Sequence, residues 1–230
     1  MNEILGSTLF LGVMLSLAAY EFGVLLKKKL KLALFNPLLV SIILIIIFLH
    51  IFQIDYAVYN DGAKYLSYLL TPATVCLAIP LYEQLELLKQ NVKAILAGIF
   101  SGALTSVTGV FILALLFHLK HEAYVTLLPK SVTTAIGMGV SEELGGIVTI
   151  TVAVIIITGV LGNMIAETVC KIFHIEEDIA KGIGIGSASH AIGTVKAMEM
   201  GEVEGAMSSL SIAVSGLITV VLASIYAQFL

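Results

Sequence analysis

The sequence contains no arginine and few charged residues of any kind. Charged side chains make up 12% of the 230 residues, whereas hydrophobic residues make up 59%. Because a soluble domain has about a quarter of its residues charged, this chain has too few to cover a solvated surface. All 12 basic residues are lysines, so the chain lacks the guanidinium group that holds phosphates and carboxylates bidentately. These shortages indicate an integral membrane protein.

Motifs for catalysis and cofactor binding are also missing. Cys76 and Cys170 lie in apolar sequence without a partner at metal-ligand spacing, and we interpret both as buried small hydrophobic residues. No phosphate-binding loop, zinc-ligand pair or nucleophile elbow is present. The glycine-rich run 182–186 is not preceded by a strand, which excludes a dinucleotide-binding motif. We therefore expect no enzyme activity, no catalytic residues, no cofactor and no metal.

Long apolar runs predict an all-α polytopic membrane protein of about eight helices. Continuous transmembrane helices are expected at about 4–26, 36–54, 92–118, 146–170 and 205–229. Between them lie three stretches of intermediate hydrophobicity, at about 65–90, 124–141 and 178–198. We expect these three to be interrupted or re-entrant helices that line a central polar site.

The lysines predict the orientation of the chain. The cluster at Lys27, Lys28, Lys29 and Lys31 is expected to be cytoplasmic, which places the N-terminus outside. If all three intermediate stretches cross the membrane, the chain makes eight crossings and both ends lie outside. We expect one transmembrane domain, in which residues 1–60 form a helix pair. Residues 61–230 then form three tandem units of an interrupted helix followed by a transmembrane helix.

Small residues recur at every fourth position in the long apolar runs. They occur at Ala94, Gly98, Gly102 and Ser106, at Thr158, Gly162 and Ala166, and at Gly205, Ser209 and Ala213. Such faces let helix backbones approach closely in lipid. We interpret them as packing surfaces within the chain, with a dimer interface as the alternative.

The intermediate stretches contain an internal repeat. Its copies are Thr74–Pro80, Ser131–Gly137 and Ser187–Gly193. Each copy begins with a hydroxyl residue, ends in Ala-Ile followed by a helix breaker, and precedes acidic residues. The even spacing and the shared context favour a true repeat, visible in the sequence only as parallel copies.

Interrupted helices in a membrane survive only where protein buries them or where they line a wet cavity. The N-termini of broken helices attract anionic groups, and transporters use them at substrate sites. The candidate binding residues are therefore Thr74, Lys130, Ser131, Thr133, Thr134, Gly137, Ser187, Ser189, His190 and Gly193. The alternative is that each hydroxyl bonds to its own helix while the glycines aid packing.

Four ionisable residues have two interpretations each. His190 could relay protons at membrane depth, or it could be a satisfied packing residue. Lys130 could supply a cation for a carboxylate, or its side chain could extend to the membrane interface. Glu142 and Glu143 could carry a coupling proton, or they could be solvated loop acids.

Several runs of the sequence resemble the CidB/LrgB family. They are Leu77–Tyr82, Leu128–Ala135, Glu143–Gly146 and Ile179–Thr194. The resemblance covers essentially the whole chain, and its last run is the most specific. The Ala-Ser-His-Ala pattern and the following Lys196–Glu199 are closer to the CidB branch.

The resemblance implies a multi-pass protein of the bacterial plasma membrane with one of two functions. Family members are known as holin-like or antiholin-like partners of small CidA/LrgA-type membrane proteins, which affect murein hydrolase activity and lysis. Others resemble carriers of small monocarboxylates of the pyruvate, lactate and glycolate class. Because a holin needs no buried polar site, the interrupted helices favour an alternating-access carrier, coupled to H⁺ or Na⁺. A purely structural module is a third hypothesis. We also expect a CidA/LrgA-type partner, a homodimer, and no binding to nucleic acid.

Overall fold

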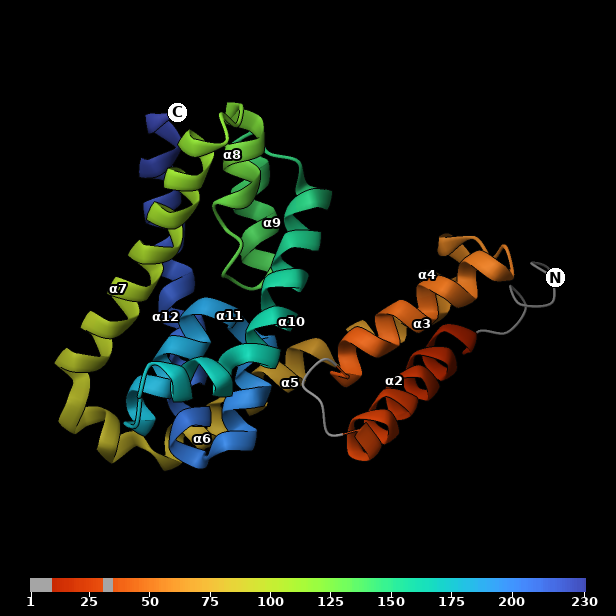
Figure 1. Ribbon diagram of the computed structural model, residues 1–230, viewed down its shortest axis with the longest axis horizontal. Helices are drawn as coiled ribbons and strands as arrows, with labels where there is room; N and C mark the ends of the chain where they lie inside the picture. Colours follow the sequence, from red (N-terminus) through yellow and green to blue (C-terminus); the bar gives the residue numbers. More distant parts are fainter. Residues whose placement is uncertain (1–9, 31–34) are drawn as a thin grey trace. The chain divides into compact units, whose positions relative to one another are not determined.

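The computed structural model describes residues 10–30 and 35–230, except for the side chains of Leu70, Thr71 and Thr74. Every regular element in this described part is a helix (Figure 1), which confirms the predicted all-α class. The chain divides into two compact units, Met1–Cys76 (unit 1) and Leu77–Leu230 (unit 2). The helix pair at 1–60 and the three tandem units at 61–230 stay a prediction.

Unit 1 is a group of helices in which α2 packs against α3 and α4. Its described helices are α2 (Leu11–Leu30), α3 (Pro37–Ile51), α4 (Tyr56–Ser67) and α5 (Leu70–Cys76). Gly23 lets α2 approach the start of α3, since a Cβ there would lie 2.8 Å from the Cα of Pro37. The Asn36 side chain caps α3 by accepting a hydrogen bond from the Leu38 amide at 2.9 Å.

The predicted helix at 4–26 is displaced in the structure. Residues 1–9 lie outside the described part, and α2 continues through Lys27, Lys28 and Lys29 to Leu30. Lysine is a good helix former, so the cluster does not end the helix. The prediction that both cysteines are buried is wrong for Cys76, which is exposed, whereas Cys170 is buried.

Unit 2 contains the three long apolar helices of the described part. Its elements are α6 (Ala78–Glu83), α7 (Leu85–Leu116), α8 (His121–Leu127), α9 (Thr134–Glu143), α10 (Val148–Ile172), α11 (Asp178–Met200), α12 (Glu202–Tyr226) and a 3-10 turn at Ala227–Phe229. Helices α7, α10 and α12 are long and apolar enough to cross a membrane. They correspond to three of the five predicted continuous spans. The span predicted at 36–54 corresponds to the shorter α3.

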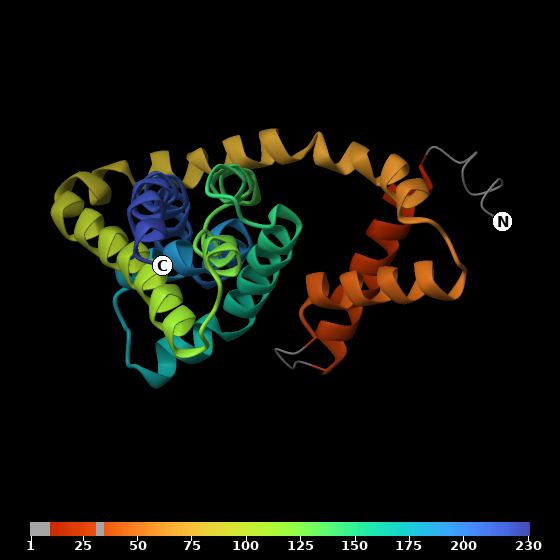
Figure 2. The ribbon, with the colours of Figure 1, turned by 90° about the horizontal axis from the view of Figure 1, so that it is seen from above.

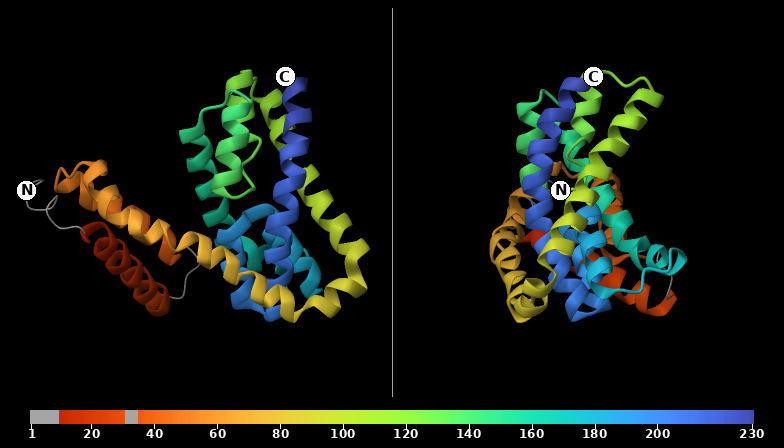
Figure 3. Two further views of the ribbon diagram at one scale, coloured as in Figure 1. Left: turned by 180° about the vertical axis from the view of Figure 1, so that it is seen from behind. Right: turned by 90° about the vertical axis from the view of Figure 1, so that its left-hand side faces the viewer.

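Helix α11 reverses direction at His190, where φ is 43° and ψ is −143°. Its first arm contains Lys181, whose Nζ lies 3.9 Å from a carboxylate oxygen of Glu204 at the start of α12. Its second arm contains Lys196, whose Nζ lies 3.0 Å from a carboxylate oxygen of Glu167 near the end of α10. The two arms therefore begin and end at the same end of unit 2 (Figure 3), and α11 is a hairpin.

Helices α8 and α9 form a second hairpin, which enters from the opposite end. Helix α9 runs antiparallel to α10, with Gly137 against Ile155 and the Ser141 hydroxyl bonded to Thr151 at 2.7 Å. The Thr151 hydroxyl also lies 2.9 Å from the carbonyl oxygen of Thr126 in α8. Figure 2 shows these short green helices between α12 and α10.

These hairpins correct the predicted topology. Each arm of α11 spans roughly 15–18 Å at 1.5 Å per residue, about half of a ~30 Å hydrocarbon core. The expectation that 124–141 and 178–198 each cross the membrane is therefore wrong, and both stretches are re-entrant. Because α7 and α10 run in opposite directions, the repeat copies at 131–137 and 187–193 enter from opposite ends of unit 2. The copies are inverted in space.

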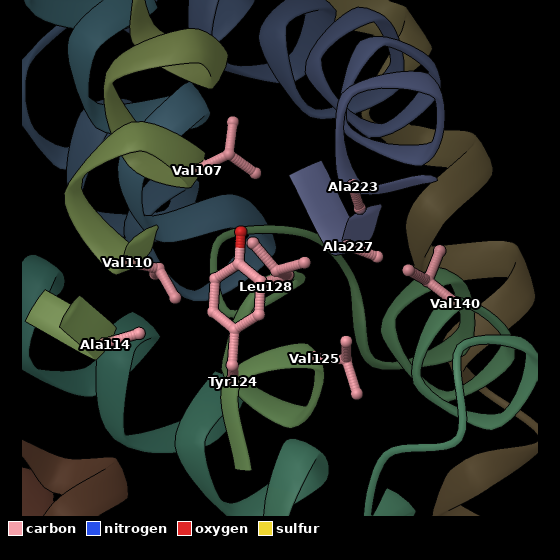
Figure 4. Close-up of a cluster of buried hydrophobic side chains, with 9 residues drawn as sticks. All are labelled: Val107, Val110, Ala114, Tyr124, Val125, Leu128, Val140, Ala223 and Ala227. Atoms are coloured by element: carbon pink, nitrogen blue, oxygen red, sulfur yellow. The ribbon is translucent and has the colours of Figure 1, made fainter. Parts of the chain in front are cut away.

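The end of unit 2 that contains α8 is closed by an apolar cluster around Tyr124 (Figure 4). Its other members are Val107, Val110, Ala114, Val125, Leu128, Val140, Ala223 and Ala227. The Tyr124 hydroxyl donates a hydrogen bond of 2.9 Å to the carbonyl oxygen of Tyr226. A buried aromatic ring with its hydroxyl satisfied fixes α7, α8, α9 and α12 together at this end.

Candidate functional site

The first arm of α11 packs on α7 through small residues. A Cβ at Gly98 would lie 3.3 Å from the Ile183 side chain, and one at Gly102 would lie 3.1 Å from the Cβ of Ser187. The Ser187 hydroxyl donates to the carbonyl oxygen of Ile183 at 2.7 Å. The two helices therefore approach closely and run in the same direction.

Beside this contact lies a cavity of about 810 Å³, the α7–α11 groove. Its walls are α7 and the first arm of α11, including Ser187, and the tip of the α8–α9 hairpin closes one end. At that tip the Lys130 ammonium donates to the hydroxyls of Ser131 at 2.9 Å and Ser106 at 3.2 Å. Glu177, the residue before α11, also lines the groove. Lys130, Ser131 and Ser187 are thus brought into one cavity, as the repeat suggested.

His190 and Ser189 face α10 instead. The His190 Nε2 lies 2.9 Å from the carbonyl oxygen of Ile155. A Cβ at Gly159 would lie 2.7 Å from the His190 Cε1, and one at Gly162 would collide with Ser189. Neither residue is among those that line the α7–α11 groove. The structure therefore divides the predicted binding residues between two faces of α11.

The other predicted residues of the second copy are at or near the N-terminus of α9. Thr133 occupies the N-cap position of α9, but its side chain makes no capping hydrogen bond. Thr134 is the first helical residue. Gly137 packs against Ile155 of α10. Glu142 and Glu143 are exposed at the end of α9. The two threonines are therefore at the start of a helix, the glycine serves packing, and the two glutamates are solvated.

The remaining predicted residues lie in the first and third copies. Gly193 packs against Ser189 and Ile185, a contact that the α11 hairpin creates. Thr74 belongs to α5, and its side chain is outside the described part.

Most buried hydroxyls of unit 2 have partners inside the protein. Thr194 bonds to the His190 carbonyl oxygen at 3.0 Å and to the Ser208 hydroxyl at 2.7 Å. Ser209 bonds to a carbonyl oxygen of its own helix at 2.8 Å. Within the described part, Ser215 is the buried side chain whose oxygen has no partner. The polar clusters therefore satisfy themselves, and they do not require a ligand.

Charged residues gather where the ends of α10, α11 and α12 meet. They surround a second cavity of about 620 Å³. The Asp178 carboxylate accepts a 2.7 Å hydrogen bond from Lys181, which lowers the pKa of Asp178. No group of three His, Cys, Asp or Glu side chains in the described residues is placed to hold a metal ion. The cluster is typical of helix ends that meet at a membrane surface.

Sequence reasoning missed most residues that line the α7–α11 groove, including two glycines. Gly109 and Gly184 line it, yet nothing lies within 4 Å of where a Cβ would sit on either. The small-residue pattern on α7 was the available signal for this surface, but it stops at Ser106 and does not distinguish packed glycines from open ones.

Comparisons with known proteins place the chain in a family. Residues 16–229 match the LrgB-like family. The chain belongs to the LrgB-like family. It is 39% identical over 222 residues to the antiholin-like protein LrgB of Bacillus subtilis (strain 168), covering 96% of each chain. It is 40% identical over 224 residues to the antiholin-like protein LrgB of Bacillus cereus (strain B4264), covering 97% of each. No solved structure matches the chain significantly.

The LrgB-like match corrects the functional expectation. The relatives are named antiholin-like, so the prediction of a monocarboxylate carrier is wrong. Part of its physical basis fails as well, because the Ser187 hydroxyl, one of those that suggested a substrate site, is bonded to the Ile183 carbonyl oxygen of its own helix. Family membership and the three long apolar helices show a multi-pass protein of the bacterial membrane. The closer relation to the CidB branch stays a prediction.

Proposed function

We propose that this chain is an antiholin-like membrane protein. In this role it restrains membrane permeabilisation by a holin and thereby limits murein hydrolase activity and lysis. Support comes from relatives that are 39–40% identical along nearly their whole length and carry the antiholin-like name. That name describes no catalytic activity, in agreement with a protein that is not an enzyme.

The fold supports this role because helices occupy the centre of unit 2, and the α7–α11 groove lies beside them. Two re-entrant hairpins occupy the space between α7, α10 and α12. The buried network of Thr126, Ser141 and Thr151 pairs its hydroxyls within the protein, so it leaves no chain of free polar groups to hold water. A protein that restrains a lesion must lie stably in the membrane without opening one itself.

An antiholin-like protein acts through another membrane protein. We propose a small LrgA-type membrane protein as the partner, in agreement with the family resemblance. Homodimers of this chain are a second assembly that we propose. The long apolar helices support a contact surface within the bilayer for both assemblies.

The proposed function is tested in a Bacillus subtilis strain that lacks its own LrgB relative. The chain is expressed there, and extracellular murein hydrolase activity and propidium entry are measured in stationary phase. Both should fall relative to cells with the empty vector, toward the level given by the B. subtilis relative in the same vector.

Membrane fractions must contain this chain and the B. subtilis relative in equal amounts. If the relative lowers both signals and this chain lowers neither, the antiholin-like role is refuted. A rise in propidium entry would instead indicate a holin.

A further inference from the structure

The surface of α7 presents two different faces. One carries bulky apolar side chains suited to lipid, among them Leu96 and Phe100, which are 47% and 48% exposed. The other lines the α7–α11 groove mostly with small or hydroxyl side chains, including Ser101 and Thr105, which are both exposed, and with the apolar Leu113. Small and polar side chains offer lipid tails little favourable contact, whereas they allow the backbone of a second helix to approach closely.

Packing within the chain explains only some of the glycines on this face. Gly98 and Gly102 are in contact with α11, and a side chain there would displace it. Gly109 of α7 and Gly184 of α11 also line the groove, but each has open space where a Cβ would be. Their small size therefore leaves room for something outside the chain.

Lys130 gives the groove a charge. Its ammonium has two serine hydroxyls as partners and no carboxylate within the described residues. A lysine at the tip of a hairpin lies well inside the membrane, where a charge is costly unless it is paired. The groove thus presents a half-buried cation that a carboxylate would stabilise.

From these observations we propose that the α7–α11 groove is the docking site for one membrane-spanning helix of a small protein partner. That helix carries a carboxylate facing Lys130 and small side chains on the same face. The inference rests on the proposed function, which requires a membrane-protein partner. It adds the surface and the chemistry of that partner.

The groove also sets the direction of the helix. Its other end is lined by Asn91 and Glu177, and about 22 Å of helix separates Asn91 from Ser106, the neighbour of Lys130. A partner helix can place an acidic residue opposite Lys130 and a lysine, about four turns away, opposite Glu177. Both pairs form only when that helix runs in one of its two possible directions. The exposed Glu177 contributes less to affinity than Lys130, because exposed ion pairs are weak.

A second copy of this chain is the competing occupant. The long helices α7, α10 and α12 carry their carboxylates near their ends, so none of them offers an acid to Lys130 at the required depth. Helix α2 carries Glu21 about halfway along its length. A copy that docks through α2 is therefore an outcome that the test must distinguish.

The test co-expresses the full chain with the tagged small LrgA-type protein of Bacillus subtilis and measures co-purification in mild detergent. Gly109→Leu and Gly184→Leu place side chains in the groove at positions where the Cβ meets no other atom of the chain. Gly139→Leu is the matched control, since Gly139 also has open space but lies on α9 outside the groove. Lys130→Gln and Lys130→Glu remove and reverse the charge.

We expect each leucine variant in the groove to lower the co-purified partner by at least about tenfold, which corresponds to ~1.4 kcal/mol of binding free energy. Lys130→Gln should lower it less than Lys130→Glu, and Gly139→Leu should leave it unchanged. Size-exclusion chromatography checks that the variants stay folded. If a leucine variant misfolds, Gly184→Cys in a background with Cys76→Ser and Cys170→Ala provides a second measurement: a photoactivatable maleimide attached to this thiol should crosslink the chain to the partner.

Four results would overturn the proposal. One is normal co-purification by folded groove and Lys130 variants. Another is a Gly184→Cys crosslink that joins two copies of the chain, with Glu21→Gln abolishing it. The third is an anionic phospholipid, detected by native mass spectrometry, that Lys130→Gln releases while the partner stays bound. If the wild-type chain and all groove variants restrain murein hydrolase equally, the docking inference fails and the proposed function stands.

Discussion

The His190 Nε2 lies 2.9 Å from the carbonyl oxygen of Ile155, in the middle of α10. The side chain of the same isoleucine packs against Gly137 of α9. The two re-entrant hairpins therefore meet at one residue of a spanning helix. Gly137 and His190 belong to two copies of the sequence repeat, so both copies contact a common support.

His190 should be a strained position. Its backbone lies in a region with φ of 43° that L-residues rarely adopt, at a cost of about 1–3 kcal/mol. His190→Ala loses the bond to Ile155 and keeps the strain. His190→Gly loses the same bond but relieves the strain, so its free energy of unfolding should be higher by roughly 1 kcal/mol. Thermal unfolding in detergent compares the two variants, and a more stable alanine variant would contradict the hairpin geometry.

Two glycines of the first α11 arm should respond oppositely to alanine. A Cβ at Gly186 would lie 2.8 Å from the Ser208 Cα and 2.8 Å from the Ser211 Cβ of α12. Gly186→Ala should therefore cost about 1–3 kcal/mol through overpacking. Gly184 has open space, so Gly184→Ala should stabilise the helix by up to ~1 kcal/mol. Equal melting temperatures for the two variants would show that α11 does not pack on α12 through Gly186.

The buried hydroxyls of Thr151 and Ser215 offer a second matched pair. Thr151 bonds to Ser141 and to the Thr126 carbonyl oxygen, so Thr151→Val should destabilise the protein by about 0.5–2 kcal/mol. The Ser215 oxygen has no partner, so Ser215→Ala should be neutral or stabilising. Denaturant unfolding measures both. A larger loss for Ser215→Ala than for Thr151→Val would refute the described hydrogen bonding.

The α11 hairpin predicts where its ends are accessible. In a background with Cys76→Ser and Cys170→Ala, Glu177→Cys and Glu202→Cys should react with an impermeant maleimide from the same side of the membrane. His121→Cys, at the start of α8, should react from the opposite side. Labelling of the Glu177 and Glu202 variants from opposite sides would mean that α11 crosses the membrane.

Much of the fold could be predicted from the sequence because the bilayer imposes a length on apolar runs. The spans that correspond to α7, α10 and α12 follow from long runs of high mean hydropathy with few charged residues. The interruptions at 124–141 and 178–198 were also predicted, since glycine, proline and hydroxyl residues weaken a helix there. The reversal at His190 could not be predicted, because a positive φ at a histidine is imposed by tertiary contacts with α10.

The candidate site was harder to predict. Sequence pattern groups Ser187, Ser189 and His190, yet adjacent helical positions point to different neighbours, here α7 for Ser187 and α10 for the other two. Sequence also cannot tell whether a hydroxyl bonds to its own helix, as Ser187 does. That ambiguity led to the carrier hypothesis, which the antiholin-like relatives overturn.

Dye release from vesicles tests the antiholin-like role most directly. The purified chain is reconstituted alone, and separately together with a small holin-like protein of the CidA/LrgA type, in vesicles loaded with calcein. The chain alone should release no dye, and it should lower the release caused by the holin-like protein in proportion to its amount. Dye release by the chain alone, or unchanged release by the holin-like protein in its presence, would contradict the account.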